Sequence, residues 1–199
     1  MNFNTKNYKN TSSTETTDNT EEEITYNIIT KGNEIYFYED IEKEQILQLI
    51  SSIKDLSYNL KLESFKYGFQ PVIHLHLYSN GGDAFMGLSA YDFIRNSDIP
   101  IYTYIDGMIA SAATFIYLAG HYRCMTENGT VLIHQISTNF WGKFEDLKDE
   151  CHNTTELMKI VKRIYSYHTT MKKKHLDQII KRELLLTYSE CVKYGIVSC

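Results

Sequence analysis

The segment "YIDGMIASAATFIYLAG", residues 104–120, holds one serine, Ser111, among small and apolar side chains just past a glycine. A buried helix has no need of that hydroxyl. A serine becomes a nucleophile when a base takes its proton and hydrogen-bond donors stabilise the oxyanion that forms. The alternative is a small residue tolerated in close packing. The residues around Ser111 favour the nucleophile, because "IYTYI" (101–105) is typical of a strand and Ala112 begins a helical pattern.

Backbone donors for an oxyanion are available on both sides of this position. The N–H of Ala112 follows the serine at the start of the expected helix, where backbone N–H groups have no intrahelical partner. The stretch "SNGG" (79–82) ends the preceding expected strand, and its glycines, Gly81 and Gly82, let the backbone approach a substrate closely. We expect the Gly82 N–H to be the second donor. A glycine pair alone is also typical of an ordinary turn.

The general base should be one of the seven histidines. His134 ends the apolar strand pattern "TVLIHQ", and proteins built from βα units collect reactive groups at strand ends. His74 and His76 alternate with apolar residues, so they share one face of their strand. Two histidines at that spacing could bind a metal, but the pattern supplies no third ligand, and we expect no metal site.

Composition excludes several function classes. With 199 residues and 43% apolar content, the chain fits one globular domain. Its net charge of −5 offers no electrostatic footprint for nucleic acid or anionic lipid, and no stretch approaches the roughly 18 apolar residues of a membrane span. The absence of an apolar signal region and the wide spacing of the cysteines favour a reducing, cytoplasmic location. No Walker-type phosphate loop is present, so we expect no nucleotide cofactor. The four cysteines are Cys124, Cys151, Cys191 and Cys199.

The chain divides into a polar tail, residues 1–23, and a domain over residues 24–199. The tail is rich in Ser, Thr and Asn, and we expect it to be disordered, either inert or serving as a docking or gating segment. The domain alternates strand and helix patterns, which predicts an α/β fold with parallel strands. Strands are expected at 33–40, 72–79, 101–105 and within 123–135, and helices at 42–57, within 81–97 and from 112.

A long helix is predicted over residues 144–168. Apolar residues recur there at steps of three and four, and Leu157, Ile160 and Ile164 add a second apolar strip. A single α/β layer rarely covers two sides of one helix. The pattern therefore favours a helix that meets another subunit over one packed entirely within its own chain.

Four segments, in this order, resemble the proteolytic subunit of the Clp protease, the ClpP family of serine peptidases. They are "SNGG", "GMIASAAT" with Ser111 at the serine position, "LIHQ" with His134 at the base position, and "LLLTYSECVKYGIV" near the C-terminus. The resemblance runs from about residue 34 to 197. Two departures stand out. Asn80 replaces the family's proline, and Glu183 occupies the position of its usual aspartate.

The resemblance implies a catalytic triad of Ser111, His134 and Glu183, with the N–H groups of Gly82 and Ala112 holding the oxyanion. Asp177 is a nearby aspartate that matches the motif less well. The implied fold is the ClpP/crotonase-like ββα superhelix, in which the helix over residues 144–168 takes the place of the protruding handle.

The resemblance also implies partners. It predicts heptameric rings stacked as a tetradecamer, polypeptide substrates cleaved inside the chamber that the rings enclose, and a separate Clp-type ATPase that unfolds them. Two other functions remain open from the sequence. One is a non-catalytic ring subunit of the same family, and the other is a crotonase-type acyl-CoA enzyme.

Overall fold

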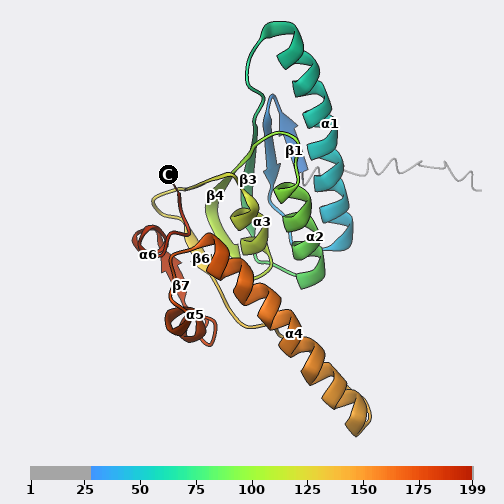
Figure 1. The fold of residues 1–199 in the computed structure, drawn as a ribbon, viewed down its shortest axis with the longest axis vertical. Helices are drawn as coiled ribbons and strands as arrows, with labels where there is room; N and C mark the ends of the chain where they lie inside the picture. The colour runs from blue at the N-terminus through green and yellow to red at the C-terminus, as the bar shows by residue number, and fades with distance from the viewer. Residues whose placement is uncertain (1–27, 199) are drawn as a thin grey trace, which may run out of the picture.

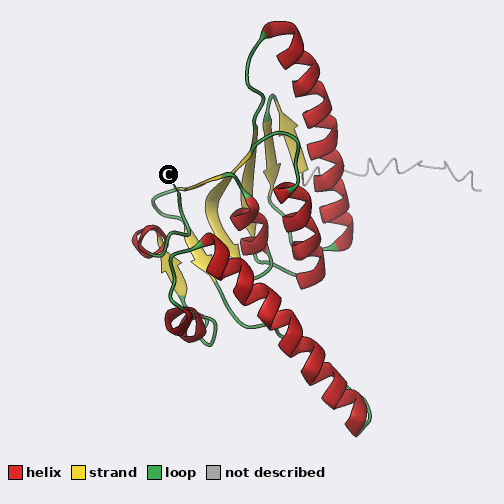
Figure 2. Ribbon diagram, viewed as in Figure 1, coloured by secondary structure: helices red, strands yellow, loops and turns green. Residues whose placement is uncertain are grey.

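The computed structural model describes residues 28–198, and the predicted tail over residues 1–23 lies outside them. One mixed β-sheet forms the centre, with helices packed on one of its faces (Figures 1 and 2). The fold class is the expected α/β. In chain order the elements are β1 (Ile28–Lys31), β2 (Glu34–Phe37), α1 (Lys43–Tyr67), β3 (Ile73–Ser79), α2 (Ala84–Arg95), β4 (Ile101–Ala110), α3 (Ala113–Ala119), β5 (Tyr122–Met125), β6 (Thr130–Leu132), α4 (Phe144–His168), α5 (Lys173–Ile179), β7 (Leu185–Thr187) and α6 (Tyr188–Lys193).

The sheet has the order β1-β2-β3-β4-β6-β7, with β5 paired to β4 beside β6. The strands β2, β3, β4, β5 and β6 run parallel, while β1 and β7 are antiparallel to their neighbours. The first half of β4 pairs with β5 and the second half with β6. At Gly107, where φ is 114°, the register of β4 against β3 shifts. A residue without a Cβ makes that bulge possible in mid-strand.

Strand alternation separates the two faces of the sheet. In β3, Ile73, Leu75 and Leu77 are fully buried beneath the helices. On the opposite face His74 bonds the Tyr104 hydroxyl and His76 bonds a carboxylate oxygen, so both imidazoles have non-metal partners. No group of three or more metal-ligating side chains occurs within residues 28–198.

Several predicted boundaries change in the structure. The first helix does not end at residue 57 but continues to Tyr67, because Leu56 and Leu60 extend its buried face, and it ends at Gly68 with φ of 75°. The strand expected over 101–105 continues to Ala110. The expected strand at 33–40 is shorter, and β1, which was not predicted, pairs with it as a hairpin.

The long helix α4 has the predicted bounds. It packs on the domain at its C-terminal end, and its N-terminal part extends away from the sheet (Figure 1). Its buried residues are Val161, Ile164, Tyr165 and His168, all in the last two turns. Phe144 and Leu147 of the protruding part stay exposed. None of the helices described between residues 28 and 198 has the length and apolar content to cross a membrane.

Two loops at the sheet edge meet by backbone contact. A Cβ built on Gly81 would lie 2.7 Å from both the Ala110 carbonyl oxygen and Ser111 Cβ. Real Cβ atoms do not approach other heavy atoms so closely, and Gly81 also has φ of 97°. The loop after β3 can therefore lie against the end of β4 only because residue 81 has no side chain.

The end of α4 is tied to the domain by His168, whose side chain is buried. His168 Nδ1 lies 3.3 Å from an Arg123 guanidinium nitrogen, so Nδ1 accepts and Nε2–H donates to the Tyr91 hydroxyl at 2.8 Å. Burial, together with the positive charges of Arg123 and Arg95, lowers the pKa of His168 to about 4. The imidazole is neutral in the folded protein at neutral pH.

This histidine should make stability fall on acidification. Between pH 6.5 and about 4 the unfolded chain protonates His168 while the folded chain does not, so stability decreases as the pH falls through that window. The contribution to the slope reaches about 1.4 kcal/mol per pH unit. Urea unfolding from pH 7.5 to 4 should show a shallower pH dependence in His168→Gln, which keeps a donor and an acceptor but does not titrate. Equal slopes in the two proteins would contradict this.

Gly81→Ala should destabilise the fold and separate the two loops. The clash with backbone atoms adds to the positive φ, so we expect a loss of about 3 kcal/mol or more in the free energy of unfolding. Gly32→Ala is the matched control, because Gly32 also has positive φ but faces open space, and it should cost about 1 kcal/mol. Urea titration of both variants measures the difference, and similar losses would refute the close approach.

Candidate active site

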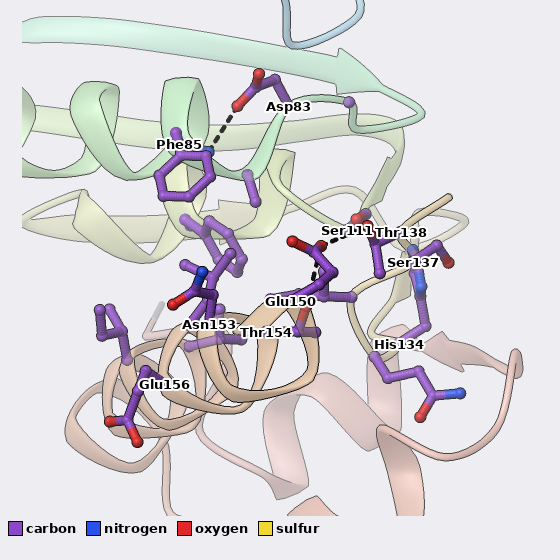
Figure 3. A pocket seen from close by; sticks show the side chains of 18 of the residues that line it. Asp83, Phe85, Ser111, His134, Ser137, Thr138, Glu150, Asn153, Thr154 and Glu156 are labelled. Atoms are coloured by element: carbon purple, nitrogen blue, oxygen red, sulfur yellow. Dashed lines mark hydrogen bonds between the residues drawn. The ribbon is translucent and has the colours of Figure 1, made fainter. Parts of the chain in front are cut away.

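Neighbouring parallel strands carry the candidate residues to one edge of the sheet. The segment 80–82 follows β3, Ser111 follows β4, and His134 lies two residues beyond β6. Because parallel strands present their carboxyl ends at the same edge, these three segments converge there. Ser111 and His134 line one cleft, shown in Figure 3. Sequence reasoning proposed both residues, and the fold brings them together.

Ser111 occupies a sharp corner between β4 and α3. It is the one non-glycine residue with positive φ, 53°, among residues 28–198. Its N–H donates to the Leu132 carbonyl at 2.9 Å, which attaches the corner to β6 two residues before His134. Its carbonyl accepts from both the N–H and the hydroxyl of Thr114. The peptide groups on both sides of the serine are therefore fixed, and the side chain projects into the cleft.

A buried tyrosine extends this anchoring to the long helix. The Thr114 hydroxyl donates to the Ser111 carbonyl, so the hydrogen bond between Thr114 and Tyr165 must be donated by the tyrosine hydroxyl. Burial raises the pKa of Tyr165, which keeps that proton in place. Sequence reasoning assigned no role to either residue. The spacing of Thr114, three residues after the serine, is a local pattern that could have indicated a hydrogen bond to the Ser111 carbonyl. The contact between Thr114 and Tyr165 is tertiary and has no such local pattern.

The His134 imidazole lies at the end of β6, half-buried in the cleft. Its Nδ1 is fully buried and has no hydrogen-bond partner in the described part of the chain. No hydrogen bond joins it to Ser111 among the described residues either. Burying an imidazole nitrogen without a hydrogen-bond partner costs free energy of folding. A carboxylate or another acceptor that bonds the Nδ1–H would remove that cost.

The antiparallel register of β6 and β7 points to that carboxylate. Leu132 pairs with Leu185, and continuing the register two residues along both strands sets His134 opposite Glu183. Side chains directly opposite each other in an antiparallel pair have Cβ atoms about 5 Å apart. The β6–β7 ladder ends before this pair, and Glu183 is exposed and makes no hydrogen bond to His134 in this structure.

Asp177, the other carboxylate considered, is engaged elsewhere. Its Oδ1 lies 2.7 Å from the ammonium of Lys162 on α4, and this hydrogen bond holds the pKa of Asp177 below its usual value. That ion pair joins α5 to α4. The register and this contact together favour Glu183 over Asp177 as the partner of His134.

Two backbone donors near Ser111 remain unused. The N–H groups of Gly82 and Ala112 donate to no acceptor among residues 28–198. The Gly81 N–H is different, because it bonds the Ser79 hydroxyl at 3.1 Å. Gly81 thus serves the site through its close contact with Ser111, while Gly82 and Ala112 keep free donors of the kind that an oxyanion requires.

The cleft has a volume of about 830 Å³ and lies between the sheet edge and α4. The helix α4 contributes both polar and apolar residues to the lining, and Figure 3 labels the polar ones, Glu150, Asn153, Thr154 and Glu156. The apolar lining consists of Ala84, Phe85, Phe115, Ile136, Leu157, Ile160, Val161 and Tyr165.

Comparison with known proteins gives a consistent result. The family model described as Clp protease matches residues 18–199. An ATP-dependent Clp protease proteolytic subunit of Deinococcus radiodurans is 28% identical over 127 residues, which are 63% of this chain and 62% of that protein. The match thus spans less than two thirds of that relative. A protein of the same name from Oenothera elata subsp. hookeri is 28% identical over 181 residues, covering 86% of this chain and 68% of that protein.

The fold agrees with these matches. The solved structure of a ClpP1 point mutant from Listeria monocytogenes superposes with a TM-score of 0.72 over 83% of this chain and 89% of that chain, at 20% identity. The predicted ClpP-like fold with a protruding helix is therefore confirmed. The family model covers nearly the whole chain, and the structure brings three of the four segments that carry the resemblance, those with Gly82, Ser111 and His134, to one cleft. On these grounds the chain belongs to the Clp protease family.

Proposed function

We propose that this chain is a serine endopeptidase that cleaves unfolded polypeptides. One observation carries the proposal: Ser111 and His134 line the same cleft, beside two backbone N–H groups that have no acceptor among residues 28–198. A nucleophile, a base and a donor pair are the groups that acyl transfer from a peptide bond requires. Neither a metal nor a nucleotide has a role in these steps.

In the proposed mechanism, Ser111 Oγ attacks the peptide carbonyl carbon while His134 takes the hydroxyl proton. The carbonyl oxygen becomes an oxyanion held by the Gly82 and Ala112 N–H groups. His134 then gives the proton to the leaving amine. In the second half of the reaction, water attacks the carbonyl carbon of the acyl-enzyme while His134 takes a proton from it, and His134 returns this proton to Ser111 Oγ as the acid product leaves. Glu183 accepts from His134 Nδ1–H, which orients the ring and stabilises the imidazolium.

We further propose that the subunit works in a stacked double ring of heptamers, fed by a separate Clp-type ATPase in the cytoplasm. The protruding half of α4 supports assembly, because Phe144 and Leu147 are exposed and no described element covers them. The unbonded state of His134 and Ser111 is consistent with a site that aligns on assembly. Sedimentation velocity should show particles of several hundred kilodaltons against 23.2 kDa for one chain.

The assembled protein should react rapidly with a fluorophosphonate probe at Ser111. An activated serine attacks the phosphorus, whereas an ordinary hydroxyl does not. Labelling followed by gel fluorescence and peptide mass spectrometry should identify Ser111, and both Ser111→Ala and heat denaturation should abolish it. Ser137 lines the same cleft, so Ser137→Ala is the matched control and should label normally.

Failure to label an assembly of verified size would overturn the peptidase proposal. Such a result would favour the non-catalytic ring subunit, for which the missing hydrogen bond between Ser111 and His134 is the supporting observation. A trimeric particle without peptidase activity would favour the crotonase-type alternative instead.

Glu183→Gln should slow probe labelling and peptide turnover by about 10³-fold or more. Without the carboxylate, His134 loses the partner that selects its tautomer and stabilises its positive charge. Asp177→Asn is the control, because it removes only the ion pair with Lys162 and should retain nearly full kcat. The pseudo-first-order labelling rates of the three proteins provide the comparison. A larger loss in Asp177→Asn than in Glu183→Gln would reverse the assignment.

A further inference from the structure

The cleft beside Ser111 carries carboxylates and no cationic side chain. Of the described residues that line it, none is Lys or Arg, while Asp83, Glu150 and Glu156 contribute acidic groups. Two of these three carboxylates are already engaged. Asp83 Oδ1 caps α2 by accepting from the N–H groups of Phe85 and Met86. Glu156 is paired with Lys159 at 2.6 Å.

Among the described lining residues, Glu150 is the carboxylate that neither caps a helix nor pairs with a cation. Its Oε1 accepts hydrogen bonds from the hydroxyls of Thr138 at 2.8 Å and Thr154 at 3.4 Å (Figure 3). Thr138 belongs to the segment after His134, and Thr154 lies one turn further along α4. These two hydroxyls hold the carboxylate in place without neutralising it. A carboxylate has about four lone-pair positions, so Oε2 remains available to a ligand.

The cleft also has apolar lining, apart from the hydroxyls that contact Glu150. Leu157 and Val161 lie further along α4 and line the same cleft, together with Ile136. An aliphatic substrate side chain would fit the apolar lining but would leave Glu150 unpaired. A long side chain with an apolar stem and a cationic end fits both features, because the stem packs on that lining while the charge meets the carboxylate.

We propose that Glu150 makes the cleft selective for a Lys or Arg side chain flanking the scissile bond. The inference rests on the proposed peptidase function and names its substrate class. Glu150 touches the substrate side chain and not the reacting atoms, so it determines specificity. Attraction between a half-buried carboxylate and such a cation should favour the cationic residue by about tenfold.

The test uses the assembled full-length protein in two steps. Cleavage of a mixed peptide library, mapped by mass spectrometry, locates the position at which Lys and Arg are enriched. Quenched fluorescent peptides with Lys or norleucine at that position then isolate the charge, since norleucine keeps the aliphatic stem. The ratio of kcat/KM for the two peptides is measured in the wild-type protein, in Glu150→Gln and in Glu156→Gln.

We expect a ratio of about ten in the wild-type protein, about one in Glu150→Gln and about ten in Glu156→Gln. The glutamine at position 150 keeps an acceptor for both threonines, so overall folding should change little, and the ratio of the two peptides reports the charge alone. A ratio near one in the wild-type protein, or an unchanged ratio in Glu150→Gln, would overturn the inference while leaving the peptidase function intact. Absence of any cleavage and of Ser111 labelling in the assembly would instead overturn the proposed function, and this inference with it.

Discussion

The site depends on the left-handed backbone of Ser111. A side-chain-bearing residue with positive φ costs about 1 kcal/mol, and here the cost is offset by hydrogen bonds from both adjoining peptide groups. The N–H bond to Leu132 sets the distance to the strand that carries His134. The carbonyl bonds from Thr114 start α3 immediately, so Ala112 keeps a free N–H. One unusual backbone conformation therefore positions the proposed nucleophile and one proposed oxyanion donor, and it ties them to the strand that precedes His134.

The sequence indicated which segments share the cleft better than it indicated the boundaries of the elements around them. Ser111, His134 and the glycine loop were found because each sits at the end of an apolar strand pattern, and parallel strands bring such ends together. The sequence did not predict that β4 extends to Ala110, because an Asp-Gly pair such as Asp106-Gly107 is typical of a turn that ends a strand. In the fold they form a bulge within it, because β6 supplies a new partner for the second half of the strand.

Other features could not be predicted, because they are tertiary. Tyr165 lies 51 positions after Thr114 in the sequence, and nothing local indicates that its hydroxyl supports the Ser111 corner through that threonine. Glu183 was already preferred to Asp177 from the resemblance, and the register of β7 and the ion pair of Asp177 with Lys162 add tertiary support for that proposal. The period of α4 did predict a helix with more apolar surface than its own domain covers, as the exposed side chains of its first turns show.

The helix α4 also joins the protruding part of the molecule to the cleft. Its last turns are fixed to the domain by His168 and Tyr165, and the Tyr165 hydroxyl reaches the Ser111 carbonyl through one threonine. Its middle turns form a wall of the cleft, and its first turns protrude. A partner that packs on the protruding turns would act on the cleft through one rigid element.

The histidine segment is coupled to that element as well. Because Thr138 after His134 hydrogen-bonds Glu150 on α4, a shift of the helix would move the segment that carries the base. The unpaired Nδ1 of His134 is the group that such a movement would have to satisfy, and Glu183 is the carboxylate that a continuation of the β6–β7 register would set opposite it. Assembly on the protruding turns would therefore act on the triad through the strand end that holds His134.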